Sequence, residues 1–197
     1  LALGLYRVGR RTRFMIKSEV MDVAIMRFLV NHTKTVPVDR SVGADAYRAA
    51  VDELSDGEMV AVYPESTISR SFELKEFKTG AARMALQAQV PIVPLVVWGA
   101  HRKWTKDHPR ALGRTKTPVS VAVGAPLAPE GSVAVVDAAL RAEMTRLLHD
   151  VQAGYPRPKG AFWVPRRLGG SAPTPEQAKV LDAEELAERA RRRAERP

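Results

Sequence analysis

A short polar run directly after an apolar segment is the part of this sequence best suited to chemistry. The apolar run 59–63 predicts a short buried strand, which ends at Pro64 because proline cannot donate a ladder hydrogen bond. The polar residues that follow are Glu65, Ser66, Thr67, Ser69, Arg70 and Ser71. A strand that ends in a polar loop is how α/β folds present functional groups at the carboxyl edge of a sheet. The alternative is a plain strand-end turn with a Ser or Thr helix cap.

Two cations stand at equivalent places after other expected strands. Lys17 ends the segment 13–17, and Arg40 follows the segment 34–38. Because successive strand ends are neighbours at one edge of a parallel sheet, we expect Lys17, Arg40 and Glu65 to converge. Arginine offers a bidentate fork and lysine a point charge, so with hydroxyls and backbone amides they would bind a phosphate. Glu65 would then bind a ligand hydroxyl or a neighbouring cation. For each residue alone, a surface salt bridge is the alternative.

The elements that must position these residues alternate along the chain. Apolar runs predict strands, and apolar residues at helical spacing predict helices. The expected strands are 13–17, 34–38, 59–63, 90–98 and 119–123. The expected helices are 20–30, 43–54, 79–89 and 132–151. This order predicts an α/β fold with a largely parallel central sheet flanked by helices.

The sequence changes character near its C-terminal end. Residues 1–153 are expected to form one domain that is incomplete at its N-terminus. The segment 154–175 is rich in Pro and Gly and predicts an extended tail. Its Phe162–Trp163 pair would pack back on the domain or lie at a membrane interface. Residues 176–197 carry balanced Arg and Glu at helical spacing, which predicts a charged, solvent-exposed helix.

Composition narrows the classes of function. The 197 residues carry a formal net charge of +9, which suits an anionic partner such as nucleic acid, anionic lipid or a phosphorylated substrate. Low aromatic content, scattered basic residues and the lack of a recognised motif argue against nucleic acid. The lack of Cys excludes disulfides, thiolate metal sites and a Cys nucleophile. No apolar run approaches the ~20 residues that span a bilayer.

Several segments, taken in order, resemble the phospholipid/glycerol acyltransferase family, which includes bacterial 1-acyl-glycerol-3-phosphate (lysophosphatidic acid) acyltransferases. The matching segments are 14–19, 36–40, 63–67, 77–82 and 90–95. The third, Tyr-Pro-Glu-Ser-Thr, is similar to the family's Phe-Pro-Glu-Gly-Thr motif. Each motif is short, but the ordered set is specific. The resemblance implies a glycerol-phosphate acyltransferase-like fold in which Arg40 binds the substrate phosphate.

The sequence departs from the family pattern at two positions of this loop. Ser66 replaces the family glycine, so the turn must be reached with a Cβ, at some conformational cost. Ile68 stands where the family usually has arginine, and Arg70 is the candidate replacement. Which residues contact the phosphate therefore depends on whether Arg70 takes the place of the arginine that Ile68 replaces.

The family's catalytic motif is a histidine followed five residues later by an aspartate. By resemblance, the histidine takes the proton of the acceptor hydroxyl and the aspartate orients the imidazole. The four histidines, none of which has Asp five residues later, are His32, His101, His108 and His149. We expect the motif upstream of Leu1, so that this chain holds no catalytic residue and is inactive alone.

The resemblance implies acyl transfer from acyl-CoA or acyl carrier protein to the free hydroxyl of 1-acyl-glycerol-3-phosphate, giving phosphatidic acid for phospholipid biosynthesis. The expected substrate-binding residues are Lys17, Arg40, Glu65, Ser66, Thr67 and Arg70. No metal or cofactor is expected, and the protein would lie at the cytoplasmic face of the cell membrane as a peripheral or monotopic protein.

Three other functions fit parts of the sequence. The acceptor could be another lysophospholipid or a glycolipid, which Ile68 permits. A non-catalytic basic module on anionic membrane or nucleic acid would also explain the charge. A serine hydrolase using Ser66 is disfavoured, because the chain lacks a Gly-x-Ser-x-Gly elbow.

Overall fold

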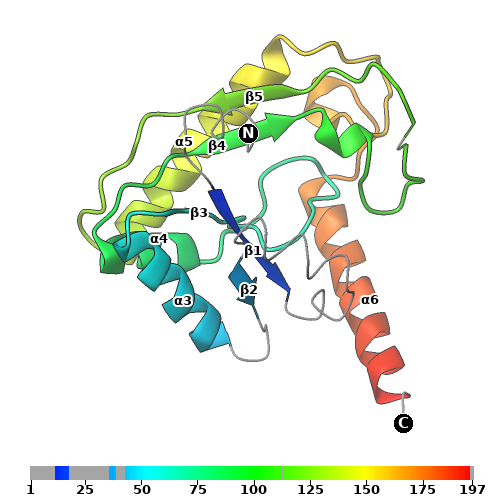
Figure 1. The fold of residues 1–197 in the computed structure, drawn as a ribbon. Helices are drawn as coiled ribbons and strands as arrows, with labels where there is room; N and C mark the ends of the chain where they lie inside the picture. Colours follow the sequence, from blue (N-terminus) through cyan, green and yellow to red (C-terminus); the bar gives the residue numbers. More distant parts are fainter. Residues whose placement is uncertain (1–11, 18–35, 39–42, 112, 196–197) are drawn as a thin grey trace. The chain divides into compact units, whose positions relative to one another are not determined.

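The computed structural model describes residues 12–17, 36–38, 43–111 and 113–195 (Figure 1). The described elements form a mixed α/β fold, as predicted. Its strands are β1 (Thr12–Lys17), β2 (Val36–Val38), β3 (Met59–Ala61), β4 (Leu95–Trp98) and β5 (Ser120–Val123). Its helices are α3 (Gly43–Ser55), α4 (Gly80–Ala88), α5 (Val133–Ala153) and α6 (Pro175–Ala194). The helix expected at 20–30 lies outside the described residues.

The described strands form two small sheets rather than one central sheet. The first has the order β2-β1-β3, and both of its pairings are parallel, as predicted. The second contains β4 and β5. The long strand expected at 90–98 is reduced to β4, preceded by an isolated antiparallel bridge between Ile92 and Leu127. Pro91 and Pro94 account for the interruption, because neither can donate a ladder hydrogen bond.

The chain divides into two compact units. The first comprises residues 1–64, 77–96 and 123–147, and the second comprises 65–76, 97–122 and 148–197. These units interleave along the chain, so neither is one continuous stretch of sequence. The domain boundaries expected at 153 and 175 stay a prediction.

In the first unit, α3 and α4 pack together over an apolar core (Figure 1). Ala50, Val51 and Met84 are buried at its centre. Helix α3 ends as predicted, because Gly57 adopts the left-handed conformation (φ +80°) and its N–H donates to the Leu54 carbonyl across 3.1 Å. Small residues on both helices allow close approach of their backbones.

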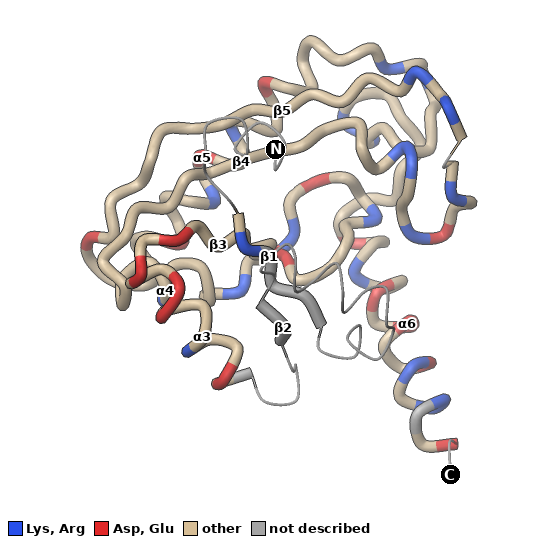
Figure 2. Tube along the Cα trace, in the orientation of Figure 1, with Lys and Arg blue, Asp and Glu red and all other residues tan. Residues whose placement is uncertain are grey.

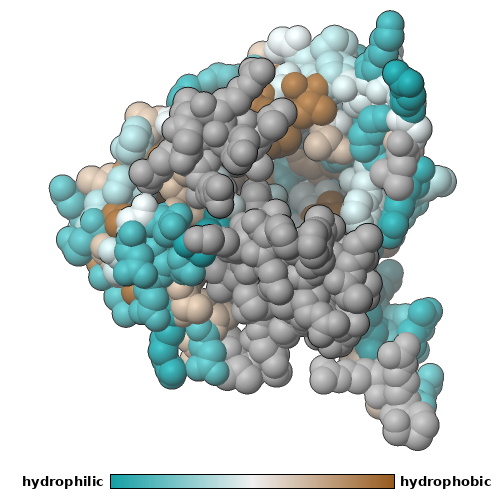
Figure 3. Space-filling model, viewed as in Figure 1, coloured by the Kyte–Doolittle hydropathy of each residue, from teal (hydrophilic) through white to brown (hydrophobic). Residues whose placement is uncertain are grey.

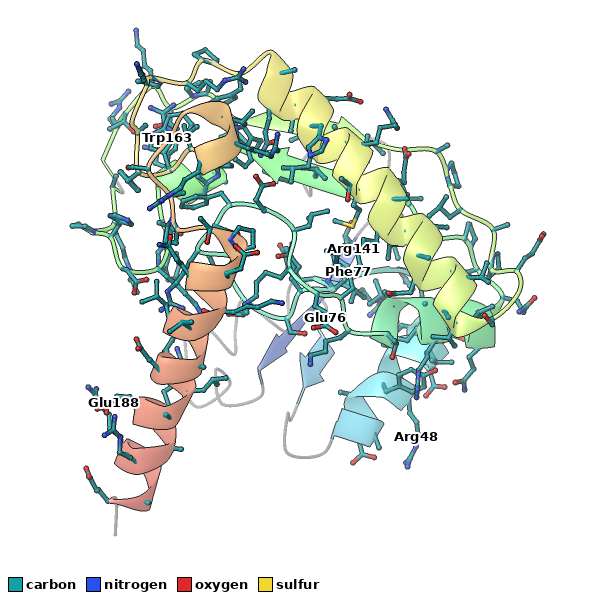
Figure 4. The ribbon with its side chains drawn as sticks, turned by 180° about the vertical axis from the view of Figure 1, so that it is seen from behind. Arg48, Glu76, Phe77, Arg141, Trp163 and Glu188 are labelled. Atoms are coloured by element: carbon teal, nitrogen blue, oxygen red, sulfur yellow. The ribbon has the colours of Figure 1, made fainter. Side chains whose placement is uncertain are left out.

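Two charged contacts connect other elements of the first unit. The Arg13 guanidinium, on β1, lies 2.8 Å from Glu53 and 2.7 Å from Glu58. The Arg141 guanidinium, on α5, lies 5.2 Å from the centre of the Phe77 ring, as a cation–π pair (Figure 4). Phe77 is itself buried and begins the segment that returns from the polar loop to α4.

In the second unit, the tail packs back on the core. Trp163 (Figure 4) is 6 % exposed. It meets the Tyr155 ring edge to face, with ring centres 5.8 Å apart. The Tyr155 hydroxyl donates to the Pro118 carbonyl across 2.6 Å, and the Arg102 guanidinium lies 4.5 Å from the Trp163 ring centre. Of the two uses foreseen for the aromatic pair, packing on the core is therefore confirmed for Trp163.

Helix α6 begins with a complete capping box. The Thr174 hydroxyl accepts from the Gln177 N–H, and the Gln177 side chain accepts from the Thr174 N–H. Sequence predicted this helix but placed it wholly in solvent, which is wrong for one face. Ala178 is 5 % exposed and the Asp182 side chain is 14 % exposed.

Candidate functional site

The three strands of the first sheet run in the same direction, toward the segments that carry the sequence motifs. The pairing of β1 with β2 places Lys17 opposite Val38, so these two strands end together. On the other side of β1, the end of β3 at Ala61 lies opposite Phe14, three residues before the end of β1. Parallel pairing therefore points the carboxyl ends of all three strands the same way, with β3 ending first. The structure describes the backbone of Lys17, and Arg40 lies outside the described residues, so the convergence of their side chains stays a prediction.

The polar loop 65–76 that follows β3 is closed by hydrogen bonds of its own. At its base, the Lys78 N–H donates to the Pro64 carbonyl across 2.8 Å. Within the loop, the Glu65 carboxylate accepts from the Lys75 N–H across 3.1 Å. Glu65 thereby joins the first and last turns of the loop. This bond gives Glu65 a role in shaping the loop besides the ligand role expected from sequence.

The hydroxyl groups of the loop divide into an inner and an outer set. The Ser69 hydroxyl donates to the Glu73 carbonyl across 2.7 Å and lies 3.1 Å from the Ser71 hydroxyl. Ser71 is 3 % exposed. Ser66 and Thr67, in contrast, are exposed. The inner hydroxyls therefore stabilise the loop, while the outer ones face solvent, where a ligand could reach them.

Ser66 has the backbone conformation that sequence anticipated. Its φ is +58°, in the left-handed region that glycine reaches without steric cost. The family motif has glycine at this position, whereas this chain adopts the left-handed conformation with a Cβ. Phe72 and Asp107 also have positive φ, at +56° and +61°. Strained backbone of this kind persists where the surroundings determine it, so it favours a site with a defined shape.

Arg70 is buried and paired with three carboxylates of the chain itself. Its guanidinium lies 2.5 Å from Asp107 and 3.0 Å from Glu185, and it also donates to Asp182. The hydrogen bond to Asp107 raises the pKa of Arg70. Burial acts in the opposite direction and lowers this pKa, whereas the hydrogen bond to Glu185 raises it further. Arg70 as a phosphate ligand stays a prediction, and a phosphate would have to displace one of these carboxylates.

Two lysines complete what we call the Arg70 cluster. Its members are Arg70, Lys75, Lys106, Asp107, Asp182 and Glu185. Lys106 lies 3.0 Å from Asp182 and 2.9 Å from Glu185, and Lys75 also pairs with Asp182. The cluster matches three cations with three anions, and it joins the loop to α6.

The two carboxylates of α6 are held in the ionised state. Burial opposes ionisation of Asp182, but hydrogen bonds from Lys75 and Lys106 outweigh it and lower its pKa. The hydrogen bond from Lys106 lowers the pKa of Glu185. Sequence reasoning missed both residues, because α6 reads as a uniformly charged helix. A signal was present: Ala178, Asp182 and Glu185 are spaced by four and three residues, which places them on one helix face.

The described histidines make no substitute for the missing catalytic pair. His101 packs among aromatic rings, 4.4 Å from the Trp98 ring and 4.8 Å from the Phe72 ring. Burial lowers the pKa of His101 to about 4, although a backbone hydrogen bond with Trp163 opposes the shift. Asp107, six residues further on, pairs with Arg70 instead. His101 is therefore a neutral packing residue at neutral pH.

The second unit also contains a pocket near the polar loop. A pocket of about 500 Å³ lies beside Ser71 and the start of α6, and Arg167 and Glu73 in its wall form an ion pair of 2.6 Å. Within the described ranges, no three His, Asp or Glu side chains are grouped to hold a metal ion.

Helices long and apolar enough to cross a membrane are not found among the described residues.

Comparison with known proteins gives the same family as the motifs. Residues 1–98 match the family described as "Acyltransferase". A 1-acyl-sn-glycerol-3-phosphate acyltransferase from Limnanthes douglasii is 33% identical over 94 residues, covering 46% of this chain and 34% of that protein. One of the same name from Cocos nucifera is 44% identical over 46 residues, covering 23% and 15%. The chain thus spans about a third or less of these relatives.

The fold has a counterpart among solved structures. The crystal structure of the 1-acyl-sn-glycerophosphate (LPA) acyltransferase, PlsC, from Thermotoga maritima aligns with a TM-score of 0.62. The alignment covers 74% of this chain and 59% of that one at 21% identity, so the likeness concerns the fold. The match over residues 1–98 shows the family: the chain belongs to the acyltransferase family.

Proposed function

We propose that this chain is the acceptor-binding part of an enzyme that acylates the free hydroxyl of 1-acyl-glycerol-3-phosphate, forming phosphatidic acid. The observation that carries the proposal is the parallel alignment of β2, β1 and β3, whose carboxyl ends lead into the three motif segments. The names of the curated relatives support the choice of acceptor. The donor is acyl-CoA or acyl carrier protein.

In the proposed reaction, the acceptor hydroxyl oxygen attacks the carbonyl carbon of the acyl thioester. A new C–O ester bond forms, the C–S bond breaks, the hydroxyl proton passes to a general base, and the sulfur leaves as a thiol after protonation. The base is the histidine of a His-x4-Asp motif that this chain does not contain. Acyl transfer is therefore expected only when such a motif is supplied together with this chain.

The residues of this chain would bind and orient the acceptor. Lys17 and Arg40 would hold the phosphate, as a point charge and a bidentate fork respectively. The exposed hydroxyls of Ser66 and Thr67 would donate to the same head group. Glu65 would fix the loop through its bond to the Lys75 N–H, which keeps those hydroxyls in place. Such positioning is a large part of what an acyltransferase can contribute beyond its base.

The nature of the acceptor beyond its phosphate rests on Ile68. This side chain is 44 % exposed at the position where the family usually has arginine. An apolar residue there removes one charge contact and offers an apolar one, which would suit another lysophospholipid or a glycolipid. We also infer that the protein works as a peripheral or monotopic protein at the cytoplasmic membrane face, where its lipid acceptor is found.

Binding of lysophosphatidic acid to Arg40→Ala and Lys17→Ala variants tests the proposal. Each loss of a charged phosphate contact is expected to weaken binding about tenfold or more, since hydrogen bonds to charged groups contribute about 1.5–3 kcal/mol. Arg48→Ala is the matched control, because this arginine on α3 is exposed and pairs with Asp45, three residues earlier on the same helix. If Arg40→Ala and Arg48→Ala bind alike, the phosphate assignment is wrong.

A further inference from the structure

The loop after β4 carries a one-sided charge. Residues 97–122 contain six basic residues and a single acidic one, Asp107, and residues 154–175 contain four basic residues and no acidic one. The charge of Asp107 is compensated within the unit, because this carboxylate forms an ion pair with Arg70. Figure 2 shows the Lys and Arg positions recurring along this loop, and Figure 3 shows the corresponding surface as mainly hydrophilic. Lys106 is compensated by Asp182 and Glu185 of α6, so the positive charge of the loop comes from its other five basic residues.

The loop and the tail each expose an aromatic ring. Trp104 is 55 % exposed and Phe162 is 40 % exposed, whereas Trp98 and Trp163 are 4 % and 6 % exposed. The Arg110 guanidinium lies 4.2 Å from the Trp104 ring centre. Phe162, from the tail, stacks on His108 of the loop with ring centres 3.9 Å apart. The two rings thus belong to one surface of the second unit.

Internal bonds hold this loop in one shape. The Ala111 N–H donates to the Lys103 carbonyl across 2.8 Å. The Lys103 ammonium donates to the Gly113 carbonyl across 2.8 Å and also to the Thr115 hydroxyl. The residues between these bonds are therefore presented as a formed turn. A fixed turn loses less conformational entropy when it docks on a partner than a flexible one does.

We propose that this surface docks the protein on an anionic lipid bilayer. We call it the basic aromatic face, and its residues are Lys103, Trp104, Arg110, Arg114, Lys116, Arg157, Lys159 and Phe162. Basic residues near an anionic bilayer each contribute favourable electrostatic energy, and Trp and Phe rings insert at the level of the headgroups. This combination of exposed cations and exposed rings fits the chemistry of such a surface.

The ring arrangement favours a bilayer over single-stranded nucleic acid. Nucleic-acid sites use open aromatic faces on which bases stack. Here one face of Trp104 is covered by Arg110, and one face of Phe162 is covered by His108. A ring with a cation over it can place the cation among lipid phosphates and its edge among the upper acyl carbons. The choice of a bilayer also rests on the proposed function, whose acceptor is a lipid.

Trp104 provides a direct measurement. Trp98 and Trp163 are buried, so a change in the environment of Trp104 dominates any shift in tryptophan emission. We expect a blue shift on adding vesicles of phosphatidylglycerol and phosphatidylcholine, no shift with phosphatidylcholine alone, and loss of the shift in Trp104→Phe. High salt is expected to reverse the binding, because exposed charges are screened. An unchanged emission maximum with anionic vesicles would overturn the proposal.

Charge variants test which surface is responsible. Removing three cations in Arg110→Gln/Arg114→Gln/Lys116→Gln is expected to weaken cosedimentation with anionic vesicles at least about tenfold. The control, Arg189→Gln/Arg191→Gln/Arg192→Gln on α6, makes the same change in net charge at another exposed surface. Equal weakening in the two triple variants would overturn the proposal, and so would tighter binding to a single-stranded oligonucleotide than to vesicles.

These assays contain neither acyl donor nor acceptor, so their outcome is separate from that of the acyl-transfer proposal. If the protein does not bind vesicles but Arg40→Ala still weakens acceptor binding, only the docking proposal is rejected. If the protein binds vesicles but Arg40→Ala leaves acceptor binding unchanged, only the acceptor-site proposal is rejected.

Discussion

Arg70 and Glu185 form an ion pair of 3.0 Å that joins the loop after β3 to the C-terminal helix. The Arg70 side chain is 7 % exposed and that of Glu185 is 24 % exposed. The pair connects the loop that carries the family motif to a helix that lies outside residues 1–98, the part matched by the family. The shape of the loop therefore depends on a distant part of the chain.

Replacing Arg70 by Ala is expected to destabilise the second unit by about 2–3 kcal/mol, because it removes a buried guanidinium and leaves its partly buried partners Asp182 and Glu185 one cation short. The value lies below the about 3–5 kcal/mol of a fully buried pair, since Lys75 and Lys106 still face Asp182. Urea unfolding followed by tryptophan emission measures it, because Trp98 and Trp163 lie in the same unit. Arg189→Ala is the control: its pair with Glu185 is exposed, so a change within about 0.5 kcal/mol is expected.

Ser66→Gly is expected to stabilise the protein by up to about 1 kcal/mol. Glycine removes the steric cost of a left-handed residue, about 1–2 kcal/mol, and adds back about 0.5–1 kcal/mol of unfolded-state entropy. Ser66→Ala separates the effect of the Cβ from that of the hydroxyl, because it removes the hydroxyl and keeps the Cβ. Chemical denaturation should show a gain for glycine and none for alanine. Equal stabilities for the glycine and alanine variants would mean that the Cβ carries no strain.

His101 is expected to make stability depend on pH between about 6.5 and 4. Burial lowers its pKa to about 4 in the folded state, below its ordinary value of 6.5. Above pH 6.5 the imidazole is neutral in both states and its full contribution is present. As the pH falls, the unfolded state binds a proton first, so stability decreases, by a total on the order of 3 kcal/mol at pH 4.

The His101→Phe variant isolates this effect, since phenylalanine fills the space among the aromatic rings and does not titrate. We expect its free energy of unfolding to be flat between pH 6.5 and 5. Asp182 and Glu185 do not interfere there, because their pKa values are lowered from ordinary values of 3.8 and 4.5. A parallel pH profile for the wild type and His101→Phe would assign the dependence to another group.

Local sequence patterns predicted the helices, strands and turns well where the structure depends on neighbouring residues of the chain. The termination of α3 at Gly57, the helix from Gly80 and the left-handed turn at Ser66 follow from short stretches of chain. The parallel order of β1, β2 and β3 follows from alternation of strands and helices, because a parallel pair needs a crossover connection. The polar loop after β3, and the resemblance of its motif to the acyltransferase family, could likewise be recognised from consecutive residues.

The tertiary structure decided what the charges of the loop do. Sequence indicates a guanidinium at Arg70 but cannot give its partners, since Asp107, Asp182 and Glu185 lie far along the chain. Burial decides the charge of His101 in the same way: desolvation among the aromatic rings lowers its pKa and keeps it neutral, and the positive charge of Arg102 acts in the same direction. By itself, the sequence determined which groups are present and at which strand ends they stand. The packing of distant segments determined which of those charges face each other, because Coulombic pairing and desolvation act through space rather than along the chain.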